Sequence, residues 1–449
     1  MIKTFTLLFS FILASIVSLA QGTPGDVGAI TSIESYTTFK GYEEAAAYLG
    51  EGEYQIFYDN IDGNLDKPLI ICDGFDPEDS RDIASIYGVG DYGTGNLFDD
   101  LRDDGTDVIL LNFPNYLRAA DGVTINGGAD YIERNGLVLV NLIESIKNDM
   151  QGSQELVVIG PSMGGLITRY ALTYMEEEGL DHQTGIWVSF DSPQRGANVP
   201  ISFQYAVNYF AEYLDNADMT SLRDVQLNSP AAKQMLLDRY TSHLLADDPY
   251  IQDTAVQLPT PNPFRTTFLT TMNAFGFPQQ TRNLALVNGS LTATMVETPG
   301  AVLMDGEIDP DGVGAADVEL HFTPLANTSN FNVDHIVVTA FGITLNTFDA
   351  VAESPSTSAG LDSAPGSTVL FDSYFDETPS DLEQQVLDAL QVDAFSFIPT
   401  LSSLVIDEQN WYTAVSGGET TPFDSYYGPD SNEPHLTLSE AGMNFLVNE

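Results

Sequence analysis

The stretch VVIGPSMGGLITRY, residues 157–170, decides the fold of this 449-residue chain. A run of branched apolar residues leads into the pentapeptide GPSMG (160–164), and an amphipathic run follows it. These patterns predict a buried strand and then a helix. A turn this tight forces Ser162 into a strained backbone conformation, and the flanking glycines remove side chains that would crowd it. The stretch therefore predicts a serine hydroxyl presented above the carboxyl edge of a sheet.

Further apolar runs with the composition of buried strands are LIIC (69–72), DVILLNF (107–113), GIWVSF (185–190) and NLALVN (283–288). Each is apolar on both faces, as parallel strands covered by helices are. Segments 132–150 and 165–179 have the apolar spacing of helices and alternate with these runs. The alternation predicts an α/β protein with a mostly parallel sheet covered by helices.

Two segments interrupt this alternation. Residues 197–282 carry Phe203, Val207 and Phe210 on one helical face, which predicts a helical cap. Residues 291–392 are rich in Asp, Thr, Ser and Gly and contain alternating runs, which predicts a β-rich insertion. The expected organisation is a signal peptide at 1–20, the first part of the sheet core at 21–196, the cap at 197–282, a core strand at 283–290, the insertion at 291–392 and the last part of the core at 393–449.

The first 20 residues have the pattern of a secretory signal peptide. Lys3 precedes an apolar run that ends in the small residues Ser18 and Ala20. We predict cleavage after Ala20 and a secreted protein, either extracellular or periplasmic. A membrane anchor is the competing interpretation, but the apolar run is short, no stop-transfer charges follow it and no cysteine stands at the junction.

The composition restricts the partners of the protein. Lys and Arg number 15 against 65 Asp and Glu, so the formal net charge is −50. Such a charge repels nucleic acid and anionic membranes. A surface hydrated in salty water explains the scattered carboxylates better than a specific cationic partner does. The one cysteine, Cys72, excludes an internal disulfide, and its apolar surroundings predict a buried, inert thiol.

The pentapeptide fits the pattern GxSxG between a strand and a helix, which favours a catalytic serine over a structural turn. In this context the chain resembles the α/β-hydrolase family, specifically its secreted lipases and esterases. The resemblance covers residues 66–196, returns near 283–288 and resumes at the C-terminus, whereas both insertions lie outside it. It implies acyl transfer through Ser162, assisted by a histidine and an acid, without a redox cofactor.

The resemblance also implies an oxyanion hole made of two backbone amides. The amide of Met163, the residue after the serine, takes the first role. In LIICDGFDP (69–77), where such lipases carry a strand followed by HGF, Asp73 stands in place of the histidine. The amide of Phe75 is therefore the candidate for the second role, and an ordinary glycine turn is the alternative.

The candidates for the catalytic base are the five histidines: His182, His243, His321, His335 and His435. The first four have poor positions, beyond the helix that follows the serine, in the cap, or at strands of the β-rich insertion. His435 lies in the polar loop PDSNEPH, before the expected last helix LTLSEAGMNFLV. Because the resembled family places its base on a loop just before the terminal helix, we expect His435 to be the base. A merely solvated histidine is the alternative.

The acid must hold the second ring nitrogen of the base. Asp191 begins DSPQRGA, which resembles the TPHxGS segment of lipases with Gln194 in place of the histidine. The family more often has its acid after the next strand, but NLALVN is followed by no carboxylate until Glu297. In calcium-dependent bacterial lipases the acid precedes a strand like FSFIPTLSS (395–403), where Phe395 stands here. We therefore expect Asp191, with a turn cap as the alternative.

The segment DPDGVGAAD (309–317) could hold a hard cation. Asp309, Asp311 and Asp317 offer oxygen ligands, although the glutamate of an EF-hand is missing. A solvated acidic turn is the alternative. We expect no required cofactor, and any calcium would be structural.

These patterns together predict a secreted serine hydrolase that cleaves carboxylic esters, with an apolar acyl chain bound under the cap. Small esters, lipids and polyesters are not distinguished. The alternatives are an amidase or thioesterase on the same fold, or a non-catalytic extracellular binding module. We expect no nucleic-acid partner and no stable membrane anchor. The oligomeric state is left open.

Overall fold

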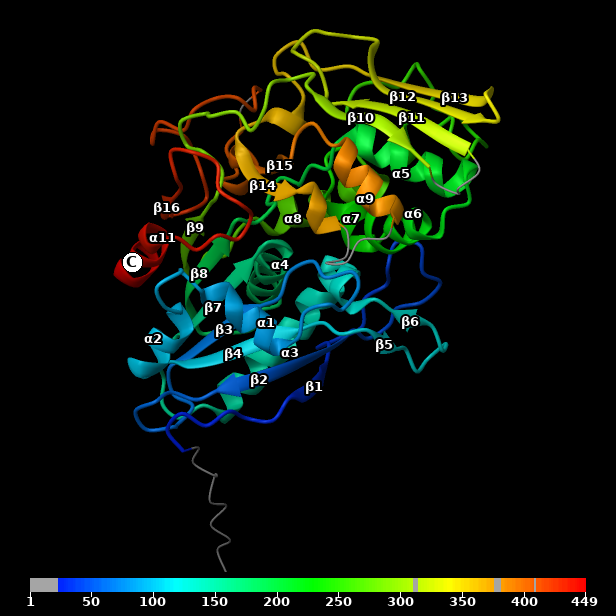
Figure 1. Cartoon of the computed structure of the whole chain (residues 1–449). Coiled ribbons are helices and arrows are strands. Elements are labelled where there is room, and N and C mark those ends of the chain that lie inside the picture. Colours follow the sequence, from blue (N-terminus) through cyan, green and yellow to red (C-terminus); the bar gives the residue numbers. More distant parts are fainter. Residues whose placement is uncertain (1–22, 310–313, 375–380, 408) are drawn as a thin grey trace, which may run out of the picture.

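The computed structural model describes residues 23–309, 314–374, 381–407 and 409–449. The expected signal peptide lies outside these residues. The described chain has two bodies, one above the other in the view of Figure 1. We call the lower one the sheet body and the upper one the second body.

The sheet body is built on an eight-stranded sheet with the order β1-β2-β4-β3-β7-β8-β9-β16. Strands β1 and β2 pair antiparallel to each other and β2 pairs antiparallel to β4, whereas all later pairings are parallel. The strands are β1 (Thr31–Glu34), β2 (Glu51–Phe57), β3 (Pro68–Cys72), β4 (Asp107–Asn112), β7 (Leu156–Pro161), β8 (Thr184–Phe190), β9 (Arg282–Leu286) and β16 (Ser425–Tyr427). The mostly parallel sheet predicted from the sequence is confirmed.

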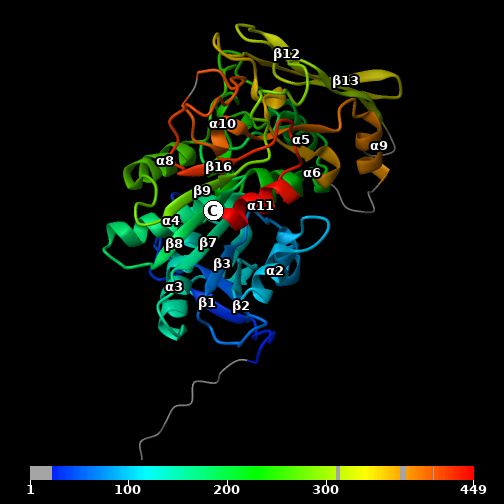
Figure 2. The same ribbon diagram turned by 90° about the vertical axis from the view of Figure 1, so that its left-hand side faces the viewer.

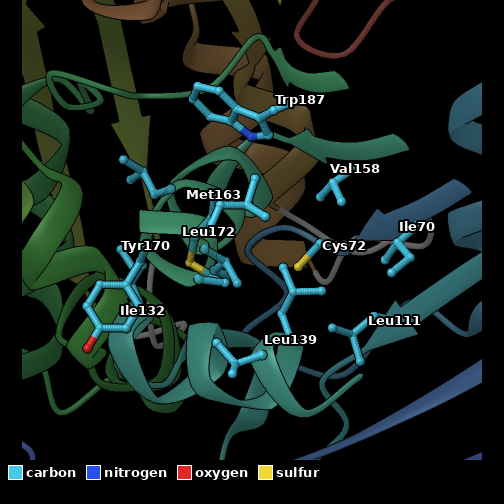
Figure 3. Close-up of a cluster of buried hydrophobic side chains, with 14 of the residues drawn as sticks. Ile70, Cys72, Leu111, Ile132, Leu139, Val158, Met163, Tyr170, Leu172 and Trp187 are labelled. Carbon is cyan, nitrogen blue, oxygen red and sulfur yellow. The ribbon is translucent and has the colours of Figure 1, made fainter. Parts of the chain in front are cut away.

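Helices cover both faces of this sheet, which explains why its central strands β3, β4, β7, β8 and β9 are mostly apolar and buried. One face packs against α3 (Ile132–Asp149), α4 (Met163–Glu177) and α8 (Pro263–Phe275), and the other against α1 (Ile83–Tyr87), α2 (Leu97–Asp103) and α11 (Glu440–Asn448). Along β3, Ile70 and Cys72 join the core on the α3 and α4 side (Figure 3), while Leu69 and Ile71 join the core on the opposite side. Figure 2 shows α11 and the C-terminus beside β9 and β16.

The second body combines both predicted insertions around one hydrophobic core. Its helical part contains α5 (Ile201–Tyr213), α6 (Ala217–Ser221), η3 (Leu222–Leu227) and α7 (Pro230–Met235), and α9 (Asp381–Ala389) lies against β10. Its β part contains an antiparallel sheet of β10 (Val302–Ile308), β11 (Gly314–His321), β12 (Phe331–Ala340) and β13 (Ile343–Ala352), and a ribbon of β14 (Gly366–Leu370) and β15 (Ala394–Pro399). Tyr209 of α5 stacks on Phe348 of β13, with 4.8 Å between the ring centroids. The cap and the β-rich insertion are therefore one structural unit.

Two boundaries differ from the expected ones. Helix α8 falls within the predicted cap, yet Phe268 and Met272 pack in the core of the sheet body. Strand β15 falls within the segment expected to end the sheet, yet it pairs with β14, and Ile398 lies in the second body's core. A short apolar run predicts a strand but not the sheet that the strand joins, which is why β15 was misplaced.

The remaining short elements are η1 (Gly88–Gly90), β5 (Tyr116–Leu117), β6 (Thr124–Ile125), η2 (Gly127–Ala129), η4 (Tyr240–Ser242), η5 (Leu361–Ser363), η6 (Phe371–Tyr374) and α10 (Thr400–Ser403). Among the described residues, no helix is both long enough and apolar enough to cross a membrane.

Candidate active site

The serine predicted as nucleophile occupies a sharp turn between β7 and α4. Ser162 has φ 51° and ψ −130°, a conformation that non-glycine residues rarely adopt and that costs about 1–3 kcal/mol. Its amide donates to the carbonyl of Phe190 at the end of β8, at 2.9 Å. The residue is 8% exposed. The sheet on one side and helix α4 on the other therefore keep Ser162 in this strained conformation.

The glycines around the serine are required by close backbone contacts. A Cβ atom on Gly160 would lie 2.4 Å from the carbonyl oxygen of Gly164, and one on Gly164 would lie 2.3 Å from the carbonyl oxygen of Cys72. A Cβ atom on Gly165 would lie 2.4 Å from Oγ of Ser192. Since real Cβ atoms do not approach other atoms this closely, larger residues at these positions would distort the serine turn or push it away from its neighbours.

A chain of hydrogen bonds joins Ser162, His435 and Asp191. Nε2 of His435 lies 2.8 Å from Oγ of Ser162, and Nδ1 lies 2.6 Å from Oδ2 of Asp191. The carboxylate favours the tautomer with Nδ1 protonated, so Nε2 is free to accept the serine proton. The structure therefore brings together the three side chains that the sequence proposed for the triad.

The sheet explains how the serine and the acid meet. Asp191 directly follows β8, the neighbour of β7, so both side chains emerge at the same edge of the sheet. Asp191 is fully buried and has φ 42°. Its amide donates to the carbonyl of Leu286 at 2.6 Å, and its Oδ1 accepts from the amide of Asn288 at 3.1 Å. These bonds fix the carboxylate toward the imidazole.

The loop that carries His435 is held by both bodies. From the second body, the carbonyl of Thr368 in β14 accepts from the His435 amide at 2.9 Å. The Thr368 amide donates to the carbonyl of Glu433 at 3.1 Å. From the sheet body, the side-chain amide of Asn288 donates to Thr437 O at 2.7 Å and to Glu433 Oε2 at 3.1 Å. The Phe397 ring meets the imidazole edge to face, with 5.0 Å between centroids.

Sequence reasoning missed Asn288, Thr368 and Phe397. Asn288 had a usable signal, because polar residues just beyond the carboxyl end of a parallel strand often contribute to a site. Thr368 and Phe397 had none, since their role depends on how the β14 and β15 ribbon docks on the histidine loop.

The two segments proposed for the oxyanion hole lie close together at the serine turn. A Cβ atom on Gly74 would lie 3.1 Å from the Ser162 Cβ and 3.7 Å from the Met163 amide nitrogen, so the loop before Phe75 passes against the turn. Within the described part of the chain, neither the Met163 amide nor the Phe75 amide donates to an acceptor. Two unused amides beside a nucleophile are what an oxyanion hole requires.

The loop of Phe75 is held by an ion pair. Nη2 of Arg81 donates to the carbonyl of Phe75 at 2.9 Å and to Oδ2 of Asp73 at 3.2 Å. Burial raises the pKa of Asp73, while Arg81 acts in the opposite direction by favouring the carboxylate. Asp73, which replaces the expected histidine, thus has a structural partner in Arg81.

A cavity of about 380 Å³ lies beside the site. Phe75 and Phe397, which flank the serine turn and the imidazole, form part of its wall. Most of the remaining wall is apolar and comes from the second body, including Val199, Leu227 and Leu236. The wall beside Phe75 is polar and includes Asp76, Glu78 and Arg81, so the cavity has an apolar side and a charged side. A largely apolar wall with a few polar groups is typical of a small-molecule site.

The other four histidines have partners elsewhere. His182 contacts Glu176, His243 contacts Asp238, His321 contacts Glu319 and His335 contacts Asp349.

Two of the three proposed calcium ligands belong to the described residues. Asp309 follows β10 and Asp317 lies in β11, but Asp311 falls outside the described residues. In the described part of the chain, no three His, Cys, Asp or Glu side chains gather as a metal site would need.

The chain was compared with known proteins and structures. No protein-family model matches it, and no curated protein does. Similar solved structures include a lipase from Bacillus licheniformis, with 10% identity over 60% of this chain and 74% of that one, and a TM-score of 0.27. An esterase from Pyrobaculum calidifontis has 12% identity over 57% and 74% of the two chains, and a TM-score of 0.27. A thermostable carboxyl esterase from Bacillus coagulans has 13% identity over 58% and 79%, and the same TM-score.

The order of strands and site residues in the chain itself identifies the fold. The parallel strands β3, β7, β8 and β9 lie in the middle of the sheet, and the serine turn follows β7. The histidine loop precedes the terminal helix α11. Because the strands have this order in the sheet, and the serine turn and the histidine loop have these places in the chain, the protein has an α/β-hydrolase-type fold with a large second body.

Proposed function

We propose that the protein is a serine hydrolase that cleaves carboxylic esters by acyl transfer. The observation that carries the proposal is the continuous hydrogen-bond chain from Ser162 Oγ through His435 to the buried Asp191. A serine, an imidazole and a carboxylate in this order form an activated nucleophile.

In the proposed reaction, Ser162 Oγ attacks the ester carbonyl while Nε2 of His435 takes the hydroxyl proton. Asp191 stabilises the imidazolium, and the Met163 and Phe75 amides donate to the oxyanion of the tetrahedral intermediate. His435 then returns the proton to the leaving alcohol, which departs and leaves an acyl-enzyme. A water molecule, activated by the same imidazole, releases the acid and restores Ser162. These groups supply the whole reaction, so no cofactor is needed.

The substrate proposed is an ester with an apolar acyl or alcohol part. The cavity beside the triad supports this, since Val199, Leu227, Leu236 and other apolar residues form one side of its wall. A volume of about 380 Å³ is at the small end of ligand sites, which favours short or medium chains within it. Hydrolysis of amides or thioesters by the same triad is the competing activity.

The test is a substrate series with matched acyl groups. Butyrate and octanoate are offered as p-nitrophenyl esters, as anilides and as thioesters, to the wild type and to Ser162→Ala. We expect the esters to be cleaved fastest and the variant to lose about a thousandfold or more in kcat. Ester cleavage that is equally fast in the variant would contradict the proposal, and faster cleavage of anilides would assign an amidase instead.

We further propose that the protein is exported and cleaved after Ala20. N-terminal sequencing of the protein recovered outside the cytoplasm is expected to begin at Gln21. An intact Met1 on the exported protein would contradict this proposal.

A further inference from the structure

A second cavity, whose lining includes none of the triad residues, lies where α8 meets α4 and the segment that follows Asp191. It has a volume of about 410 Å³. Arg169 of α4, Arg195 and Arg265 of α8 all line it. Three of the chain's 15 basic residues thus surround one cavity in a protein of net charge −50. We call it the arginine cavity.

The two buried arginines of this cavity have no carboxylate partner within the described residues. Arg169 donates to the carbonyls of Gly276 and Met272, at 2.7 and 2.9 Å, and to Gln194 Oε1, at 3.3 Å. Arg265 donates to the carbonyls of Met235 and Arg195. These bonds hold both guanidinium groups in place, but carbonyl dipoles do not neutralise two full charges.

The pKa values of Arg169 and Arg265 are consistent with buried guanidinium groups that have no carboxylate beside them. Burial lowers the pKa of Arg169 to about 9, and burial together with the nearby charge of Arg195 lowers the pKa of Arg265 to about 10. Both groups still carry their charge at neutral pH. Asp407, which pairs with Arg195 at 3.1 Å, is the one acid among the described lining residues, and it is exposed. An anion inside the cavity would therefore relieve an unfavourable concentration of positive charge.

The rest of the wall indicates what kind of anion fits. The Arg169 guanidinium lies over the Phe277 ring, 3.5 Å from its centroid, and Arg195 lies 5.9 Å from the Trp411 centroid. Both rings line the cavity. Planar guanidinium groups bind carboxylates through paired hydrogen bonds, and aromatic walls favour an apolar body.

We propose that the arginine cavity binds a small organic carboxylate with an apolar or aromatic body. The site is separate from the proposed catalytic chemistry and does not depend on it. Its ligand would contact Arg195, four residues after Asp191, so the same short segment forms part of both sites.

The test uses 4-bromobenzoate and its uncharged isostere 4-bromobenzamide with the full-length mature protein. In titration calorimetry, we expect saturable binding of the carboxylate and at least tenfold weaker binding of the amide. In crystals soaked with the carboxylate, the anomalous signal of bromine is expected between Phe277 and Trp411. Equal binding of both compounds, no binding of the carboxylate, or bromine located only beside Ser162 would overturn the proposal.

Variants sharpen this test. Arg169 and Arg265 tie helix ends together and are unsuitable, whereas Arg195 is partly exposed. We expect Arg195→Gln to weaken 4-bromobenzoate binding about tenfold or more, and Arg195→Lys to weaken it less. Arg223→Gln is the matched control, because Arg223 also pairs with acids but lies outside the cavity. Full affinity in Arg195→Gln would contradict the assignment, and so would an equal loss in the control. Ester hydrolysis is not a readout, so a failure of the proposed function would leave this result unchanged.

Discussion

The sheet body and the second body differ in how their cores are assembled. In the sheet body, β3, β7, β8 and β9 are buried on both faces, and α1 and α4 are the next helices in the chain after β3 and β7, although α11 comes from the C-terminus. In the second body, α5 packs against β13, although more than a hundred residues separate Tyr209 from Phe348. Local patterning thus determines the first body, whereas the second depends on docking between distant segments. The histidine loop lies between them and is bound by both.

The largest effect is expected at the junction of β8 with the histidine loop. Asp191→Asn removes the acceptor that favours the productive imidazole tautomer. By analogy with the same change in a serine protease, we expect kcat to fall by about 10³–10⁴-fold. The measurement is p-nitrophenyl ester hydrolysis, with circular dichroism as a check of folding. A folded variant with full activity would show that Asp191 only caps its turn.

The next effect tests the contribution of the second body to the site. Phe348 stacks on Tyr209 and lies far from Ser162 in sequence. Phe348→Ala removes this ring and should lower the free energy of unfolding by about 3–5 kcal/mol. Because β14 and β15 hold the histidine loop, we expect denaturant to abolish activity before the sheet body unfolds. Fluorescence of the buried Trp187, measured in a Trp411→Phe background, reports on the sheet body. Coincident loss of activity and of Trp187 burial would mean that the two bodies unfold as one.

A smaller effect is expected at Asn288, which supports the loop from the sheet side. Asn288→Ala removes the side-chain bonds to Thr437 and Glu433 but keeps the backbone amide that donates to Asp191. We expect kcat to fall about 10- to 100-fold with little change in KM, since a slightly misplaced imidazole affects the chemical step. A rise in KM alone would assign Asn288 to substrate binding.

The second body contains a buried carboxyl that should make its stability pH-dependent. Asp334 is fully buried, neither of its oxygens has a partner among the described residues, and burial raises its pKa well above the usual value. A folded pKa above the unfolded one means that folding retains the proton. The contribution of the protonated Asp334 to the stability of the fold is therefore complete below about pH 4. It falls by about 1.4 kcal/mol per pH unit as pH rises toward the folded pKa.

Asp334→Asn tests this account because asparagine cannot ionise. The difference in unfolding free energy between the variant and the wild type should grow from pH 4 to pH 7 in favour of the variant. A difference that stays constant over this range would show that Asp334 is not kept protonated by the fold.

The smallest effect concerns the tip of the β12–β13 hairpin in the second body. Phe341 is 89% exposed and has φ 51°, a conformation that asparagine adopts more readily. We expect Phe341→Asn to raise stability by a few tenths of a kcal/mol up to about 1 kcal/mol in thermal unfolding. A clear loss of stability would mean that the ring packs against a neighbour.

These comparisons show what the sequence could and could not predict. The proximity of Ser162 and Asp191 follows from two apolar runs that each end at the carboxyl edge of a parallel sheet. His435 could be selected by its place before the last helix. The roles of Thr368 and Phe397 could not be predicted, because they depend on the docking of β14 and β15, and an apolar strand pattern does not specify its partner. Arg81 was missed because one arginine near an acidic loop has no distinctive pattern.

The central claim is that the Ser162 oxygen is an activated nucleophile. The most direct test is to incubate the mature protein with a fluorophosphonate at neutral pH and to map the adduct by peptide mass spectrometry. The account predicts one rapid adduct on Ser162 in the wild type, a much slower one in His435→Ala and none in Ser162→Ala. No adduct on the folded wild type, or an adduct that persists in Ser162→Ala, would contradict it.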